Sequence, residues 1–129
     1  MKPTLNRYLM FTAAIALMAL AAATPTRAAL GLGDKITFSG AVALPGVVLP
    51  AGAYTFEIAN PDSSLSVVRV TRRDTGRVLF SGHTQTIPRP VNLPADQLVG
   101  LGEAPRGEAV PIMVWYPSGR SQGHRFTYR

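Results

Sequence analysis

Hydrophobic and polar residues alternate with a two-residue period along much of the chain. Two segments show the pattern most clearly: Ile36 and Phe38 alternate with polar neighbours, and Tyr54, Phe56 and Ile58 do the same further on. A two-residue period places alternate side chains on opposite faces of a β-strand. The pattern therefore predicts two strands, each with one buried and one exposed face.

A hairpin is predicted over residues 65–87. Residues 65–71 are rich in β-branched side chains, which favour strands. The turn Arg73-Asp74-Thr75-Gly76 suits a type I turn closed by a left-handed glycine, with Val78–Ile87 as the return strand. Four further strands are expected at Val47–Leu49, Leu98–Glu103, Val110–Tyr116 and His124–Arg129.

Glycine and proline interrupt the chain too often for long helices. All 12 glycines lie after residue 28, and Pro88, Pro90 and Pro94 predict an irregular surface connection. Connections this short favour antiparallel pairing. We therefore expect an all-β fold, an antiparallel β-sandwich of seven or eight short strands, with a small closed β-barrel as the alternative.

The N-terminus has the pattern of a secretory signal peptide. Lys2 and Arg7 precede an apolar stretch, residues 9–23, which is shorter than the roughly 20 residues that span a bilayer. We expect residues 1–28 to be the signal, cut after Ala28, with a cut after Ala23 as the alternative. Residues 29–129 then form a single domain, periplasmic or extracellular, with no permanent membrane span.

Charge and cysteine content exclude several classes of protein. Removing Lys2, Arg7 and Arg27 lowers the basic residues from 13 to 10 against 7 acidic ones, so the formal charge falls from +6 to +3. That charge does not favour nucleic-acid binding. The chain has no cysteine, which removes disulfides, thiolate catalysis and cysteine-type zinc sites.

One candidate ligand site lies near the C-terminus. If Trp115 and Met113 faced solvent, they would form an apolar platform for a sugar ring or a partner, with Tyr116, Arg120 and His124 beside it. The alternative is a central strand covered on both faces, with Trp115 in the core.

A second candidate is a group of four arginines around the predicted hairpin. Arg69, Arg72, Arg73 and Arg77 could hold phosphate or sulfate groups of an envelope polymer. The alternative is solvation, because charged hairpin tips and edges also deter strand-to-strand aggregation.

Residues for catalysis or metal binding are few. His83 and His124 are the only histidines, and their spacing matches no metal motif. Ser81 precedes His83 by two residues, but no nucleophile-elbow sequence is present. We expect no catalytic residue, metal or cofactor, and a serine or metal-assisted hydrolase remains a remote alternative.

Three stretches resemble small exported bacterial β-rich proteins of unassigned activity. They are Ile36-Thr37-Phe38-Ser39, the turn and strand at residues 47–56 with its Leu-Pro-Ala-Gly-Ala-Tyr sequence, and Trp115-Tyr116-Pro117 followed by Gly123 and Phe126-Thr127-Tyr128. The resemblance implies export and β-structure, and it supplies no catalytic or cofactor residues.

These observations favour a non-catalytic exported domain with a structural or interaction role. Its partner would be an envelope protein or a polysaccharide. A binding domain for a glycan or envelope polymer is the alternative.

Overall fold

The computed structural model describes residues 33–129. The expected signal peptide and the residues up to the start of the first strand lie outside this range. Within residues 33–129 the secondary structure consists of strands and turns, without a helix. The expectation of an all-β fold is therefore confirmed.

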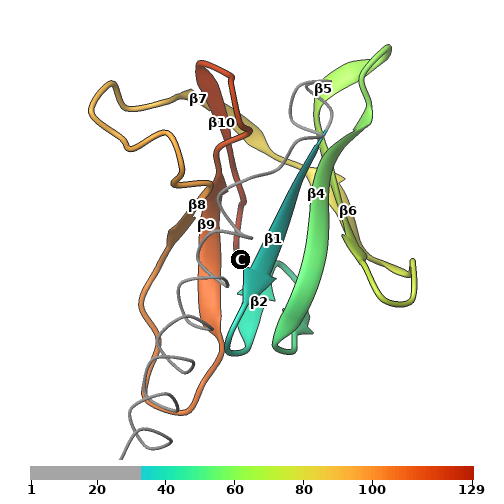
Figure 1. Ribbon diagram of the computed structural model, residues 1–129, viewed down its shortest axis with the longest axis vertical. Coiled ribbons are helices and arrows are strands. Elements are labelled where there is room, and N and C mark those ends of the chain that lie inside the picture. Colours follow the sequence, from blue (N-terminus) through green and yellow to red (C-terminus); the bar gives the residue numbers. More distant parts are fainter. Residues whose placement is uncertain (1–32) are drawn as a thin grey trace, which may run out of the picture.

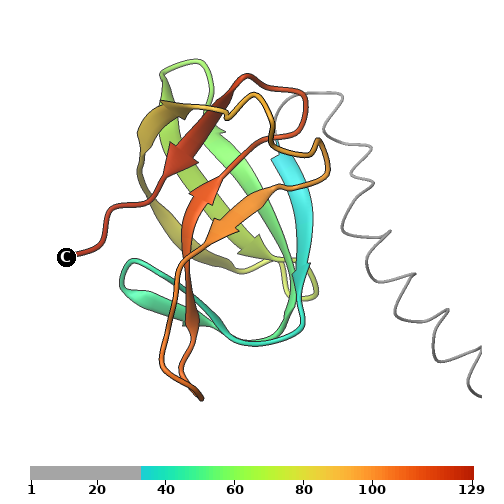
Figure 2. The same cartoon turned by 90° about the vertical axis from the view of Figure 1, so that its left-hand side faces the viewer.

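Ten strands form two sheets, whose arrangement Figures 1 and 2 show from two sides. In chain order the strands are β1 (Gly33–Phe38), β2 (Val42–Leu44), β3 (Val47–Leu49), β4 (Gly52–Asn60), β5 (Ser64–Arg72), β6 (Val78–His83), β7 (Gln85–Pro88), β8 (Val99–Leu101), β9 (Val110–Trp115) and β10 (Gln122–Arg125).

One sheet has the strand order β1-β4-β5-β6, and its pairs are all antiparallel. The other has the order β3-β2-β9-β10-β7, with β8 paired to β9. In Figure 2, strands β8 to β10, coloured orange to red, lie in front of the cyan and green strands of the first sheet. The two packed sheets are consistent with the β-sandwich expectation.

Residues 33–129 contain ten strands instead of the expected seven or eight, because the return strand of the hairpin is split and because β2 forms where no strand was expected. The segment Val78–Ile87 breaks at Thr84, where the chain leaves one sheet as β6 and enters the other as β7. The backbone of Thr84 is held at the crossing, because its N–H donates to Ser66 O over 2.8 Å. One continuous stretch of chain thus contributes a strand to each sheet.

Two further expectations need correction. Pairing is not purely antiparallel, because β2 runs parallel to β9, with Val42 opposite Val110. These two strands are far apart in the sequence, so no short connection forces them to be antiparallel. The last strand ends at Arg125 instead of Arg129, although Phe126 N–H still donates to Met113 O over 2.9 Å.

The alternation predicted for the first two strands and the turn predicted for the hairpin are confirmed. Ile36 and Phe38 are buried, as are Tyr54, Phe56 and Ile58. The turn after β5 closes at Gly76, which has φ +71° and donates its N–H to Arg72 O over 2.8 Å. The positive φ explains the glycine, because other residues rarely adopt this conformation.

Aromatic rings link the two sheets in the core. Phe56 of β4 lies between Phe38, at a centroid distance of 6.2 Å, and Trp115 of the opposite sheet, at 6.0 Å. Aliphatic side chains complete the core: Ile36, Val42, Leu44, Leu49, Ile58, Val68, Val70, Leu98 and Ile112. Burial of these side chains supplies most of the stability of a domain without disulfides.

Candidate functional site

Trp115 is part of the core and not a surface residue. Its side chain is 0% exposed, between Phe56 and the ring of His124, so the exposed platform considered for Met113 and Trp115 is wrong. The pairing of β8 with β9 shifts between Gly100–Val114 and Leu101–Ile112, which leaves Met113 as an extra residue. This bulge lets Ile112 and Trp115 both enter the core, contrary to strict alternation.

Asp34 is a buried carboxylate that the sequence analysis did not single out. It is 1% exposed, and Oδ2 accepts hydrogen bonds from Trp115 Nε1 and from the N–H of Ser118, both at 3.0 Å. Oδ1 is buried as well and has no hydrogen-bond partner among residues 33–129. The alternation that places Ile36 and Phe38 inside also places Asp34 inside, and this signal could have identified it.

His124 packs against the Trp115 indole. It is 5% exposed and stacks on that ring at 5.4 Å between centroids. Its Nδ1 lies 3.2 Å from Thr84 Oγ1, which donates to Ser66 O over 2.8 Å. Since the hydroxyl proton is used for Ser66, the contact with His124 requires a proton on Nδ1. Burial, together with the positive charge of Arg120, lowers the pKa of His124 below its ordinary value.

Tyr116 is covered by glycine and arginine. It is nearly buried beside Gly123, and the Arg89 guanidinium lies 5.5 Å from its ring centroid. Arg89 also donates to Pro94 O over 2.6 Å, so one side chain both covers Tyr116 and holds the proline-rich loop. Tyr116 is therefore used in packing that loop against the sheet.

The four residues of the first candidate site do not converge on one surface. Trp115 and His124 meet in the core, and Tyr116 packs under Arg89. Arg120 is exposed and lines a shallow polar hollow of about 360 Å³ with Gly119, Ser121 and Gln122. What remains accessible is thus a polar turn without an aromatic platform.

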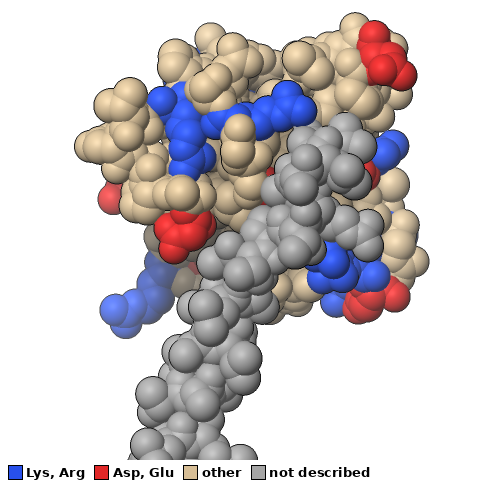
Figure 3. Space-filling model, turned by 45° about the horizontal axis from the view of Figure 1, so that its top comes forward, with Lys and Arg blue, Asp and Glu red and all other residues tan. Residues whose placement is uncertain are grey.

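The four hairpin arginines divide between different environments. Arg69 forms an ion pair with Glu57 at 2.9 Å, and Arg72 forms one with Asp74 at 2.9 Å. Arg72 lies opposite buried Tyr54, whereas Arg69 lies opposite Glu57, which is not buried. Arg73 and Arg77 are exposed. Figure 3 shows Lys and Arg in separate groups, some of them beside Asp or Glu.

The histidines do not form a metal site in the part of the chain that the structure describes. His83 is exposed on β6 opposite Val67, whereas His124 is buried on β10. Within residues 33–129 no group of three or more His, Asp or Glu side chains could hold a metal ion.

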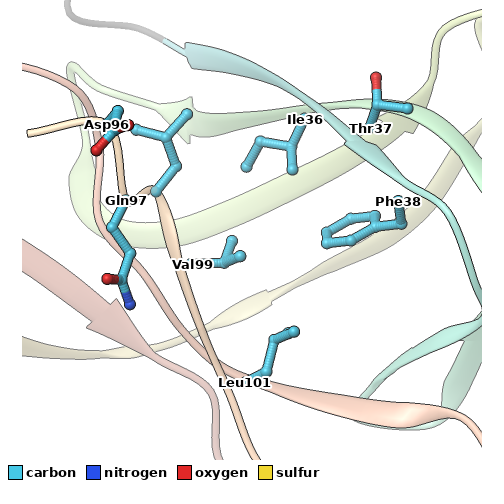
Figure 4. Close-up of a pocket in the computed structure, with 8 residues that line it drawn as sticks. Ile36, Thr37, Phe38, Asp96, Gln97, Val99 and Leu101 are labelled. Atoms are coloured by element: carbon cyan, nitrogen blue, oxygen red, sulfur yellow. The ribbon is translucent and has the colours of Figure 1, made fainter. Parts of the chain in front are cut away.

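An apolar groove separates β1 from β8. A pocket of about 260 Å³ is lined by Ile36 and Phe38 on one side and by Leu98, Val99 and Leu101 on the other, with Asp96 and Gln97 also in the lining. Figure 4 shows Ile36 and Phe38 pointing toward Val99 and Leu101, while Thr37 points away. The sequence analysis missed this groove, because it depends on the pairing of distant strands.

The groove continues past Phe38 and Leu101. A second hollow of about 230 Å³ shares these two residues and adds Ala41, Val42 and Val110. Among the described strands, β1 is the last of its sheet, and β8 pairs only with β9. The groove is therefore bordered by two strand edges whose outer backbone groups pair with no other described strand.

Comparison with known proteins gave no match to a family model, a curated protein or a solved structure. Residues 33–129 contain no helix long and apolar enough to cross a membrane.

Proposed function

We propose that this chain is an exported, non-catalytic β-domain that binds an extended polypeptide segment of another envelope protein. The observation that carries the proposal is the apolar groove between the edges of β1 and β8. Strand edges offer backbone N–H and C=O groups at a regular spacing, which another extended backbone can pair with. Such an edge suits a polypeptide better than a polysaccharide.

The groove also provides side-chain contacts for such a segment. Ile36 and Phe38 contribute from one strand at a two-residue spacing, and Val99 and Leu101 do so from the other. Leu101 is 51% exposed, although it is a large apolar residue. A bound strand with alternating apolar residues would remove this surface from water.

The buried polar groups support a non-catalytic role. Asp34 and His124 are engaged with Trp115 in the core, and neither lines the groove. Their hydrogen bonds join strands and turns of the sandwich. These two buried polar residues thus act in packing the sheets together.

Peptide titration tests the proposal. The probe is a fluorescent peptide of alternating valine and threonine with a lysine at each end. We expect saturable binding that weakens about tenfold in Leu101→Glu, because a buried carboxylate would face the apolar residues of the peptide. Val48→Glu is the matched control, since Val48 is 60% exposed on β3 and does not line the groove.

Two results would argue against this function. Equal peptide affinity for the parent and both variants would separate binding from the groove. Binding of an envelope polysaccharide that depends on Arg120 but not on Leu101 would favour the polymer-binding alternative.

A further inference from the structure

The two strands that border the groove run in the same direction along it. The first hollow contains Ile36 and the residues that lead into β8, whereas Phe38 and Leu101, the last residues of β1 and β8, are shared with the second hollow. Figure 4 shows the same order, with Asp96 and Ile36 toward one end and Leu101 toward the other. A segment in the groove can therefore run antiparallel to both strands, and antiparallel pairing is the more stable kind.

A single carboxylate marks one end of this groove. Among the described residues that line the two hollows, Asp96 is the only charged one, and it lies in the first hollow with Ile36. The second hollow, which extends from Phe38 to Val42 and Val110, has only apolar and small polar residues in its described lining. The groove thus offers a negative charge to one end of a bound segment and none to the other end.

The Asp96 carboxylate is accessible to a ligand. Its residue is exposed, and no cation within residues 33–129 forms an ion pair with it. The ion pairs in this range use the carboxylates of Glu57 and Asp74. A cation brought by a bound segment would therefore meet no competing partner at this carboxylate.

The loop that carries Asp96 is held in place by hydrogen bonds. Gln97 N–H donates to Pro94 O over 3.0 Å, which closes a turn around Asp96. The Arg89 side chain donates to the same carbonyl oxygen over 2.6 Å. These bonds fix the backbone beside the groove, so Asp96 is positioned before a ligand arrives.

We propose that Asp96 recognises a lysine or arginine on the C-terminal side of the alternating apolar residues in a segment bound antiparallel to β1 and β8. This inference rests on the proposed function, because it names the kind of sequence that the groove binds. In this orientation the C-terminal end of the segment lies beside Ile36 and Asp96, and its N-terminal end lies beside Leu101 and Val110. The basic side chain then pairs with the carboxylate while the apolar side chains fill the two hollows.

Two peptides of identical composition test this direction. Both alternate valine and threonine between an acetylated N-terminus and an amidated C-terminus, with lysine at one end and glutamine at the other. We expect the peptide with the C-terminal lysine to bind about threefold more tightly than the peptide with the N-terminal lysine, which is the effect typical of an exposed ion pair. The difference should shrink at high salt, because exposed charges are screened. Calorimetric titration measures both affinities.

The variants separate charge recognition from binding in general. Asp96→Asn should make the two affinities equal while binding still depends on Leu101, because the substitution removes the charge and preserves the shape of the side chain. Asp62→Asn is the matched control, since Asp62 is exposed and lines neither hollow. This control should keep the preference of the parent.

The outcomes distinguish this inference from the proposed function. If Leu101→Glu weakens binding but the two peptides bind the parent equally, or their difference survives in Asp96→Asn, this inference is overturned and the proposed function stands. Tighter binding of the peptide with the N-terminal lysine overturns the antiparallel orientation and hence the inference. Absence of binding by both peptides, or binding that Leu101→Glu leaves unchanged, overturns the proposed function and this inference with it.

Discussion

Trp115 and Asp34 join the two sheets through one buried hydrogen bond, from indole Nε1 to Oδ2 over 3.0 Å. The bond runs from β9 of one sheet to β1 of the other. The same Oδ2 accepts the N–H of Ser118 and so also fixes the turn after Trp115. The rings of Phe56 and His124 also pack against this indole.

Removing the Asp34 carboxylate should destabilise the fold. Asp34→Ala leaves the Trp115 and Ser118 donors unpaired in the interior, at a cost of about 2 to 4 kcal/mol. Asp34→Asn should cost less, because its amide oxygen can still accept both bonds. Urea unfolding followed by Trp115 fluorescence measures the difference. A loss no larger than that of exposed Asp62→Ala would contradict the assigned role.

Acidification should weaken the domain through His124. Burial first, and the charge of Arg120 second, lower the pKa of His124 in the folded state. The unfolded chain therefore takes up its proton near pH 6.5 while the folded chain resists it. Stability should be fully present above about pH 6.5 and fall as the pH drops from there through the lower folded-state pKa.

Urea midpoints between pH 7.5 and 5 measure this dependence. His124→Gln should flatten the slope, whereas His83→Gln should keep it, because His83 is exposed. An unchanged slope in His124→Gln would assign the acid sensitivity to other groups.

Tyr128 should lose its proton only at strongly alkaline pH. Burial raises its pKa to about 12. The unfolded tyrosine ionises near pH 10, so the stability that Tyr128 contributes is present below pH 10 and lost as the pH rises toward about 12. Absorbance titration of tyrosinate should lose its latest step in Tyr128→Phe. A parent titration complete by pH 10.5 would contradict the burial of this hydroxyl.

Gly123 should not tolerate a side chain. A Cβ at this position would lie 2.6 Å from Tyr116 Cδ1. Gly123→Ala must therefore displace Tyr116 from beneath Arg89, which we expect to cost about 1 to 3 kcal/mol. Gly40→Ala is the control, because nothing lies within 4 Å of its added Cβ. Equal Tm values for the two variants would show that Tyr116 moves at little cost.

Local physics explains why much of the fold was predictable. The two-residue period at Ile36 and Phe38 follows from the strand itself, and the turn at Gly76 requires a residue that tolerates positive φ. Neither feature depends on distant parts of the chain. The same holds for the irregular segment that contains Pro90 and Pro94, whereas Pro88, which was expected in that segment, ends β7 opposite Gln122.

The features that the sequence did not predict depend on contacts between distant residues. The bulge at Met113 brings Trp115 into the core, and it arises from the register shift in the pairing of β8 with β9. The break at Thr84 reflects the transfer of the chain from one sheet to the other. The groove likewise forms only when β1 and β8 come together. A sequence pattern carries no signal for these pairings.

Hydrogen exchange on the peptide-bound domain tests the central claim most directly. The alternating valine–threonine peptide should protect backbone amides of β1 and β8 and leave those of the Gly119–Gln122 turn unchanged. Leu101→Glu should remove this protection while Val48→Glu retains it. Protection confined to the Gly119–Gln122 turn, or absent from both β1 and β8, would contradict the account of the groove as the binding site.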